Sequence, residues 1–158
     1  MLGTIETRRC FIGDARFHIS VIGNVGKRLK QEMTRLISHG VTHFVCAAEA
    51  GLNSIAAAMA VVLKNDCPDI TLTFVLPSEE YTVFGSKREQ DFFAGISREA
   101  DEILYASEYP SGQSAQICER QIIDSAMYCI CHAKNQSKAK RAVEYARDNG
   151  KIIVDLTL

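Results

Sequence analysis

The chain has 158 residues, of which 47% are hydrophobic and 23% are charged, a composition that is typical of a globular domain and excludes a disordered or collagen-like chain. The formal net charge is −1, so the protein as a whole does not attract nucleic acid or an acidic membrane, and we do not expect nucleic acid as a partner. No apolar run approaches the roughly 20 residues of a membrane-spanning helix, and the N-terminus has no signal-peptide core; we therefore expect a single cytoplasmic domain over residues 1–158 with no membrane partner.

Short apolar runs alternate along the chain with stretches in which apolar residues recur at helical spacing. In chain order, the pattern predicts strand 8–13, helix 25–37, strand 42–48, helix 54–65, strand 70–77, helix 86–100, strand 102–107, helix 112–126, strand 127–133, helix 139–146 and strand 151–156. Helix 54–65 is apolar nearly all round, which predicts packing on both of its sides. In helix 86–100, Phe92, Phe93 and Ile96 are expected to face inward.

This alternation predicts the α/β class, with a Rossmann-like three-layer α/β/α architecture and a mostly parallel sheet of about six strands. In such a sheet, ligands bind at the carboxyl ends of the strands, near the point where the strand order reverses. The loops expected at that edge are 13–24, 47–53, 77–86, 107–114 and, less firmly placed, 133–138.

The six cysteines lie mostly inside apolar runs, where an unpaired cysteine behaves as a small hydrophobic residue, so we expect reduced thiols. The closest approach to a metal motif is Cys129, Cys131 and His132. In a strand, the two cysteines share one face and the histidine points to the other. No second ligand pair completes a four-ligand set, so no metal site is predicted.

Several segments in order resemble the YpsA-like branch of the SLOG superfamily, which groups the Smf/DprA DNA-processing proteins with the LOG phosphoribohydrolases. They are RRCFIG, GVTHFVCAAEAGLNSIAAAMAVVLK, PDITLTFVLPSEE, ADEILYASE and RAVEYARDNGKIIV. The resemblance spans essentially the whole chain. It implies a modified Rossmann fold and a nucleotide or a nucleotide-derived ligand, such as ADP-ribose, that some members sense; no cofactor is certain.

The loops that bind the ligand in this family are only partly kept here. The family's first strand ends in T-G-H-R, and this chain has Gly13 and Asp14, with Arg16 one place later. The second loop reads S-G-x-x-x-G-x-D in relatives, and here Cys46, Ala47, Gly51 and Asn53 occupy the four named positions, so only the second glycine is kept.

The later loops are altered in the same way. Pro77 and Glu79 stand in the third loop, where relatives carry Pro-Phe-Glu. A later R-N-R-x-x-x-D keeps Arg120 and Asp124, but Glu119 replaces the amide between the arginines. The resemblance therefore implies a ligand site formed by ten positions: Gly13, Asp14, Arg16, Ala47, Gly51, Asn53, Pro77, Glu79, Arg120 and Asp124.

These replacements weaken a phosphate site. The methyl group of Ala47 hinders close approach of a phosphate to the backbone, and Asn53 forgoes the charge-assisted bond that an aspartate makes to a ribose hydroxyl. Glu119 repels phosphate if it faces the cleft. We expect a small anionic ligand with modest, micromolar or weaker affinity, bound at the turn around Gly51 rather than near Lys138.

Other interpretations remain open. Gly51 can serve only a tight turn with nothing bound, and Arg120 and Asp124 can form a surface ion pair four residues apart. No nucleophile, base and orienting group can be assembled, so catalysis is not expected. Three functions follow in order of preference: a sensor-type binding protein, a scaffold with a decayed pocket that acts as a homo-oligomer, and a phosphoribohydrolase-like enzyme.

Overall fold

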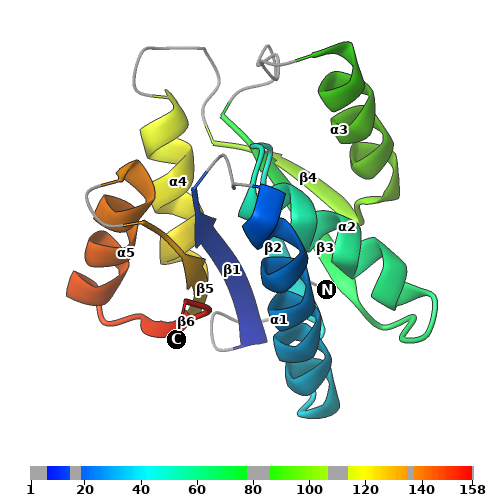
Figure 1. Cartoon of the computed structure of the whole chain (residues 1–158), viewed down its shortest axis with the longest axis horizontal. Helices are drawn as coiled ribbons and strands as arrows, with labels where there is room; N and C mark the ends of the chain where they lie inside the picture. The colour runs from blue at the N-terminus through cyan, green and yellow to red at the C-terminus, as the bar shows by residue number, and fades with distance from the viewer. Residues whose placement is uncertain (1–6, 15–18, 78–85, 107–113, 135–136, 158) are drawn as a thin grey trace.

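A computed structural model describes residues 7–14, 19–77, 86–106, 114–134 and 137–157 (Figure 1). Its strands are β1 (Arg8–Gly13), β2 (His43–Ala47), β3 (Thr71–Leu76), β4 (Glu102–Tyr105), β5 (Tyr128–His132) and β6 (Ile152–Asp155). Its helices are α1 (Ile19–Ser38), α2 (Leu52–Lys64), α3 (Lys87–Glu99), α4 (Ser114–Asp124) and α5 (Lys138–Asp148). Each predicted strand is present, with ends that differ by no more than two residues.

The strands form one sheet in the order β4-β3-β2-β1-β5-β6, and every pair is parallel. The predicted α/β fold with its parallel sheet of six strands is therefore confirmed. The chain moves outward from β1 through β2 and β3 to β4, and then returns to the other side of β1 through β5 and β6. The order thus reverses between β1 and β5, where the fold leaves a crevice at the carboxyl ends.

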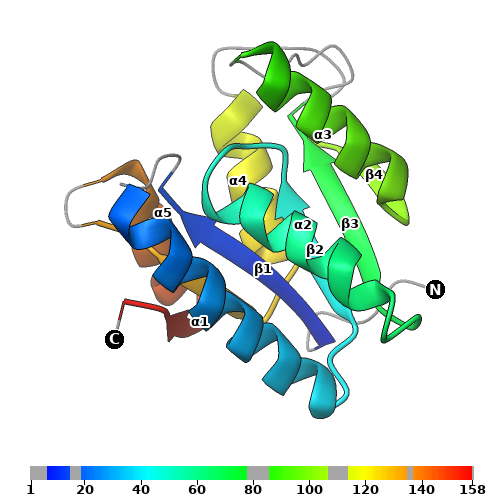
Figure 2. The same cartoon turned by 45° about the vertical axis from the view of Figure 1, so that its right-hand side comes forward.

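Helices cover both faces of the sheet, and each face has its own apolar core. On one face, α1, α2 and α3 pack over side chains that include Phe11, Phe44 and Phe74. On the other face, α4 and α5 pack over a core that includes Cys10 and Cys129. Figure 2 shows α1 and α2 in front of the sheet and α4 and α5 behind it. The alternation of side chains along each buried strand separates these two cores.

Helix α1 begins well before the predicted position, so residues 19–24, the second half of the expected loop 13–24, are helical. Gly23 and Gly26 lower the helix propensity of this stretch. Val21 and Val25 both pack against the core, and they continue the row of Leu29 toward the start of the helix. Burial of this row outweighs the unfavourable propensity of the glycines.

Two predictions about inward-facing residues are wrong. Phe93 and Ile96 of α3 are buried, but Phe92 is 40% exposed. Helix α2 is not covered on both sides, because Val62 is 59% exposed and lines an open apolar groove between α2 and α3. The apolar side of α2 is wider than the surfaces that α1, α3 and the sheet offer to it.

All six cysteines are free, and five of them are buried. Cys129 and Cys131 share one face of β5, whereas Ile130 between them belongs to the opposite core, as expected for a strand. The thiols of Cys10 and Cys129 lie 3.3 Å apart on neighbouring strands. None of the described helices is long and apolar enough to cross a membrane.

Candidate functional site

The turn between β2 and α2 is held by one buried side chain, Asn53. Its Oδ1 atom accepts a hydrogen bond from the N–H of Ala47 at 2.9 Å. Its Nδ2 atom donates to the carbonyl oxygen of Phe11 at 3.2 Å and to a carboxylate oxygen of Glu49 at 2.9 Å. Asn53 is only 1% exposed, and its two amide N–H groups are both used inside the protein. It therefore ties the turn to β1 and does not offer an N–H to a ribose.

Gly51 immediately precedes α2 and occupies its N-cap position. Its φ angle of 91° lies in the region that favours glycine, which explains the residue type at this point of the turn. No side chain caps the helix through a hydrogen bond. The N–H of Ala47, one of the backbone donors expected to meet a phosphate here, is already bonded to Asn53.

Gly13 and Asp14 hold the end of β1 against its neighbours. A Cβ atom at Gly13 would overlap with the side chain of Leu52, so glycine allows β1 and the start of α2 to pack closely. The Oδ2 atom of Asp14 accepts a hydrogen bond of 2.7 Å from the N–H of Lys134, which follows β5. The two residues thus stabilise the crevice where the strand order reverses.

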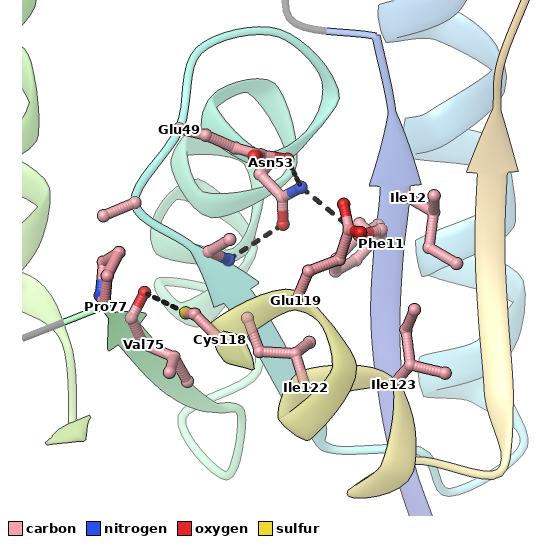
Figure 3. Close-up of a pocket in the computed structure, with 12 residues that line it drawn as sticks. Phe11, Ile12, Glu49, Asn53, Val75, Pro77, Cys118, Glu119, Ile122 and Ile123 are labelled. Carbon is pink, nitrogen blue, oxygen red and sulfur yellow. Dashed lines mark hydrogen bonds between the residues drawn. The ribbon is translucent and has the colours of Figure 1, made fainter. Parts of the chain in front are cut away.

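A small cavity lies above the carboxyl ends of β1, β2 and β3 and beneath α4, and we call it the inner cavity (Figure 3). Its volume is about 50 Å³, which is enough for one or two water molecules or a single small polar group. It is lined by Phe11, Ile12, Ala47, Ala48, Glu49, Asn53, Val75, Pro77, Cys118, Glu119, Ile122 and Ile123.

Two carboxylates line the inner cavity, Glu49 from the turn and Glu119 from α4. Burial and then the negative charge of Glu119 raise the pKa of Glu49 to about 7, while Lys138 and the hydrogen bond from Asn53 act in the opposite direction. Burial also raises the pKa of Glu119, against the lowering effect of Lys138, Arg120 and Arg141. The cavity is therefore acidic when both groups are ionised, and near neutral pH Glu49 can donate as well as accept.

A second depression, which we call the outer groove, lies between α4 and α5. Its volume is about 310 Å³, and it is lined by Gln116, Glu119, Arg120, Lys138, Arg141, Ala142 and Tyr145. Glu119 lines both the inner cavity and the outer groove, so the two spaces adjoin. Three of the residues that line the groove are cationic.

The aromatic ring of Tyr145 organises one wall of the outer groove. The guanidinium carbon of Arg120 lies 4.9 Å from the centre of this ring, within the range of a cation–π contact. The hydroxyl group of Tyr145 donates to Asp124, at 3.1 and 3.2 Å from its two carboxylate oxygens. Within the described part of the chain, Arg120 and Asp124 form no ion pair with each other; they both contact α5 through Tyr145.

Most of the predicted site residues lie at one edge of the sheet, but they do not line a single pocket. Ala47, Asn53 and Pro77 line the inner cavity, and Arg120 lines the outer groove. Asp124 is the last residue of α4 and accepts the hydrogen bond of Tyr145, but it does not line the groove. Arg16 and Glu79 lie outside the described residues.

The electrostatics weigh against an anion at the Gly51 turn, because Glu49 and Glu119 both lie beside it while the cations gather around Lys138. Tyr145 and Arg141 were missed by sequence reasoning. The available signal for them was the spacing of α5, which places Lys138, Arg141 and Tyr145 on one helical face.

No group of three histidine, cysteine, aspartate or glutamate side chains that could hold a metal ion occurs among the residues that the structure describes. The inner cavity itself offers two carboxylates, but Lys138 and the amide of Asn53 already interact with Glu49.

The YpsA family model, described as the YspA SLOG family, matches residues 12–151. The chain belongs to this family. The match covers β1 from Ile12 onward and ends just before β6, so it includes the outer groove and every residue that lines the inner cavity except Phe11. No curated protein matches the chain.

Two solved structures of DNA processing protein A share the fold. The protein from Streptococcus pneumoniae superposes with a TM-score of 0.68 at 18% identity, over 94% of this chain and 49% of the other. The protein from Helicobacter pylori, which binds single-stranded DNA, superposes with a TM-score of 0.64 at 14% identity, over 96% of this chain and 65% of the other. The chain thus spans 49% and 65% of the lengths of these two proteins, and at such identities the likeness shows the fold alone.

The expectation that nucleic acid is not a partner, which was drawn from the net charge, is wrong. A protein with the same fold binds single-stranded DNA. A net charge sums over the whole surface, whereas a nucleic acid contacts one patch, so a formal charge of −1 does not exclude such binding.

Proposed function

We propose that this SLOG-family chain binds a nucleotide or a nucleotide-derived molecule, such as ADP-ribose, at the carboxyl edge of its sheet and acts through binding rather than catalysis. The phosphate lies in the outer groove, near Lys138, Arg141 and Arg120. A hydroxyl or amino group of the ribose or base points into the inner cavity, toward Glu49 and Glu119.

The observation that carries this proposal is the shared wall formed by Glu119, which joins a cationic groove to an acidic cavity. A nucleotide has the same polarity, because it carries an anionic phosphate at one end and hydrogen-bond donors at the other. The outer groove, at about 310 Å³, lies at the lower end of the volumes of small-molecule sites. The inner cavity admits only a single small group, which suits a donor at the tip of the ligand.

The pKa of Glu49 adds a dependence on pH. Because this pKa is about 7, the cavity gains negative charge as the pH rises from 6 to 8. An anionic ligand is then bound less tightly, and Glu49→Gln removes this dependence. The hydrogen bond between residue 49 and Asn53 is retained in this variant, since the glutamine carbonyl still accepts.

The test is a panel of AMP, ADP, ADP-ribose and nucleotide sugars, measured by thermal shift and by calorimetry. We expect at least one ligand with micromolar affinity. Arg141→Ala and Lys138→Ala should each weaken it about tenfold, the typical loss for a charge-assisted contact. Lys30→Ala is the matched control, because Lys30 is an exposed cation on α1, far along the chain from the groove, and it should leave the affinity unchanged.

Two outcomes would contradict the proposal. If the panel gives no binding at millimolar ligand, the interpretation as a scaffold with a decayed pocket is favoured. If a ligand binds with the same affinity to Arg141→Ala, Lys138→Ala and wild type, its phosphate does not lie in the outer groove.

Single-stranded DNA is a second candidate ligand, favoured by the protein of the same fold that binds it. The outer groove combines three cations with the ring of Tyr145, and such combinations of charge and aromatic side chain bind single strands. Fluorescence anisotropy with a labelled oligonucleotide measures this directly. If DNA is the ligand, binding should decrease steeply with salt, and Tyr145→Ala should weaken it, whereas the mononucleotide panel should give no comparable affinity.

A further inference from the structure

Strand β4 forms one edge of the sheet, and its outer side has no neighbouring strand in the described part of the chain. Its three consecutive apolar residues are all exposed: Ile103 by 38%, Leu104 by 43% and Tyr105 by 49%. Natural edge strands are usually protected by lysine, proline or a bulge, because their free N–H and C=O groups can pair with another chain. Between Ile103 and Tyr105, β4 has no charged residue and no proline.

The opposite edge differs. Strand β6 also carries an exposed isoleucine, Ile152, which is 46% exposed. It ends, however, in the exposed Asp155, and Lys151 precedes it, so charges flank its apolar residues. Among the described residues, β4 carries charge only at its start, at Asp101 and Glu102, whereas charges lie on both sides of the apolar residues of β6. The two edges therefore form a pair for comparison in which β4 is the less protected.

We propose that β4 is the interface of a homodimer in which the β4 strands of two copies pair antiparallel and join their sheets into one. A second copy is the occupant that the edge itself favours, because a two-fold axis perpendicular to the sheet makes the edge self-complementary. With this axis at Leu104, that residue opposes Leu104 of the partner subunit. Ile103 then opposes the partner's Tyr105, an aromatic and β-branched pair that stabilises antiparallel strands.

Charge is consistent with this register. Glu102, the one charged residue of β4, opposes the partner's Ala106 rather than another carboxylate. No like charges face each other across the axis within Glu102–Ala106.

A hollow beside β4 increases the surface that a second copy can contact. It lies on the face of the sheet that carries α4, has a volume of about 270 Å³, and is lined in part by Val75, Leu104 and Ile122. On this face α4 packs against β2 and β3, and Gln121 of α4 donates a hydrogen bond of 3.2 Å to the carbonyl oxygen of Ala106, just after β4. Leu104 of the partner lies on the same face in the proposed register, so it covers the open side of this hollow.

Sedimentation equilibrium of the full chain, from low to several hundred micromolar, tests the dimer. Because a pair of four-residue strands buries a small area, we expect a reversible monomer–dimer equilibrium with weak affinity. Leu104→Lys places a charge on the axis and should weaken the dimer at least tenfold. Ile152→Lys makes the same change on β6 and should leave the dimer unchanged.

A cysteine pair tests the register. In a Cys67→Ser background, Leu104→Cys should form a disulfide-linked dimer under mild oxidation, because the two residues face each other. Ile103→Cys should not, because its own partner position is Tyr105.

The proposal is overturned if wild type is monomeric throughout the concentration range, or if Ile152→Lys rather than Leu104→Lys disrupts the dimer. Thermal melts of dilute protein confirm that each variant folds. If Leu104→Lys does not fold, Tyr105→Lys gives the same test at a side chain that is half exposed.

Discussion

Replacing Glu49 with glutamine should stabilise the protein, and more so at high pH. Glu49 lies in the turn before α2, lines the inner cavity and has a pKa of about 7 instead of 4.5, chiefly because it is buried. The folded protein therefore holds the proton of this carboxyl more tightly than the unfolded chain does. Glutamine has nearly the same shape and still accepts the hydrogen bond of Asn53, but it cannot ionise.

The expected size follows from this pKa. When a carboxyl pKa rises from 4.5 in the unfolded chain to about 7 in the folded state, ionisation costs the folded state about 3 kcal/mol. Because the folded state binds more protons than the unfolded state in this window, the free energy of unfolding of wild type falls as the pH rises from 4.5 to 7. The gain from Glu49→Gln should thus be below about 1 kcal/mol at pH 5 and reach about 3 kcal/mol at pH 8.

Urea denaturation at pH 5, 6, 7 and 8 measures both curves, and equal slopes with denaturant show that the two proteins unfold in the same way. Glu144→Gln is the matched control, because Glu144 is exposed on α5. Its stability curve should run parallel to that of wild type. The reasoning about the inner cavity is refuted if the difference between Glu49→Gln and wild type stays constant from pH 5 to pH 8, since Glu49 would then titrate like a carboxyl in water.

Three further predictions concern the same edge of the sheet and the thiols. Asn53→Ala should lower the free energy of unfolding by about 3 kcal/mol in urea denaturation, because it leaves the part-buried N–H of Ala47 and the carbonyl oxygen of Phe11 without this partner; a loss below about 1 kcal/mol would show that the turn does not depend on this amide. Gly13→Ala should lower stability by about 1–3 kcal/mol in the same assay, because the new methyl group overlaps with Leu52, and an unchanged stability would contradict the close packing of β1 and α2. Iodoacetamide at pH 8 should alkylate Cys67 of the folded protein first, as mass spectrometry can show, because the other five thiols are buried; rapid labelling of any of those five would disprove this order.

The elements of this fold could be read from the sequence because their signals are local. The buried strands are short apolar runs, and α5 shows its inward face through Ala139, Ala142, Val143 and Ala146. Alternation of strands and helices then left few topologies, because parallel connections have one preferred hand. Helix α1 was the exception, since the packing of Val21 against a distant part of the chain determines where it begins.

The sequence placed the turn 47–53 at the carboxyl edge, and the family resemblance named positions within it; most of the expected loops 77–86 and 107–114 lies outside the described residues. The sequence did not show which contacts each of these residues makes. Asn53 was expected to contact a ligand, but its side-chain amide donates a hydrogen bond to the carbonyl oxygen of Phe11, which lies 42 residues away in the chain. Gly13 suggested room for a phosphate, but the space that it leaves is filled by Leu52.

By itself, the amino-acid sequence determined the order of strands and helices and the parallel sheet, because propensity and hydrophobic period depend on neighbours in the chain. The family followed from the resemblance of its ordered segments. Only the tertiary structure decided the chemistry of the site. The pKa of Glu49 depends on burial and on Glu119, 70 residues further along, and the outer groove exists only because α4 and α5 pack side by side. The unprotected edge at β4 also depends on the tertiary structure, since no local sequence pattern shows which strand lies at the edge of a parallel sheet.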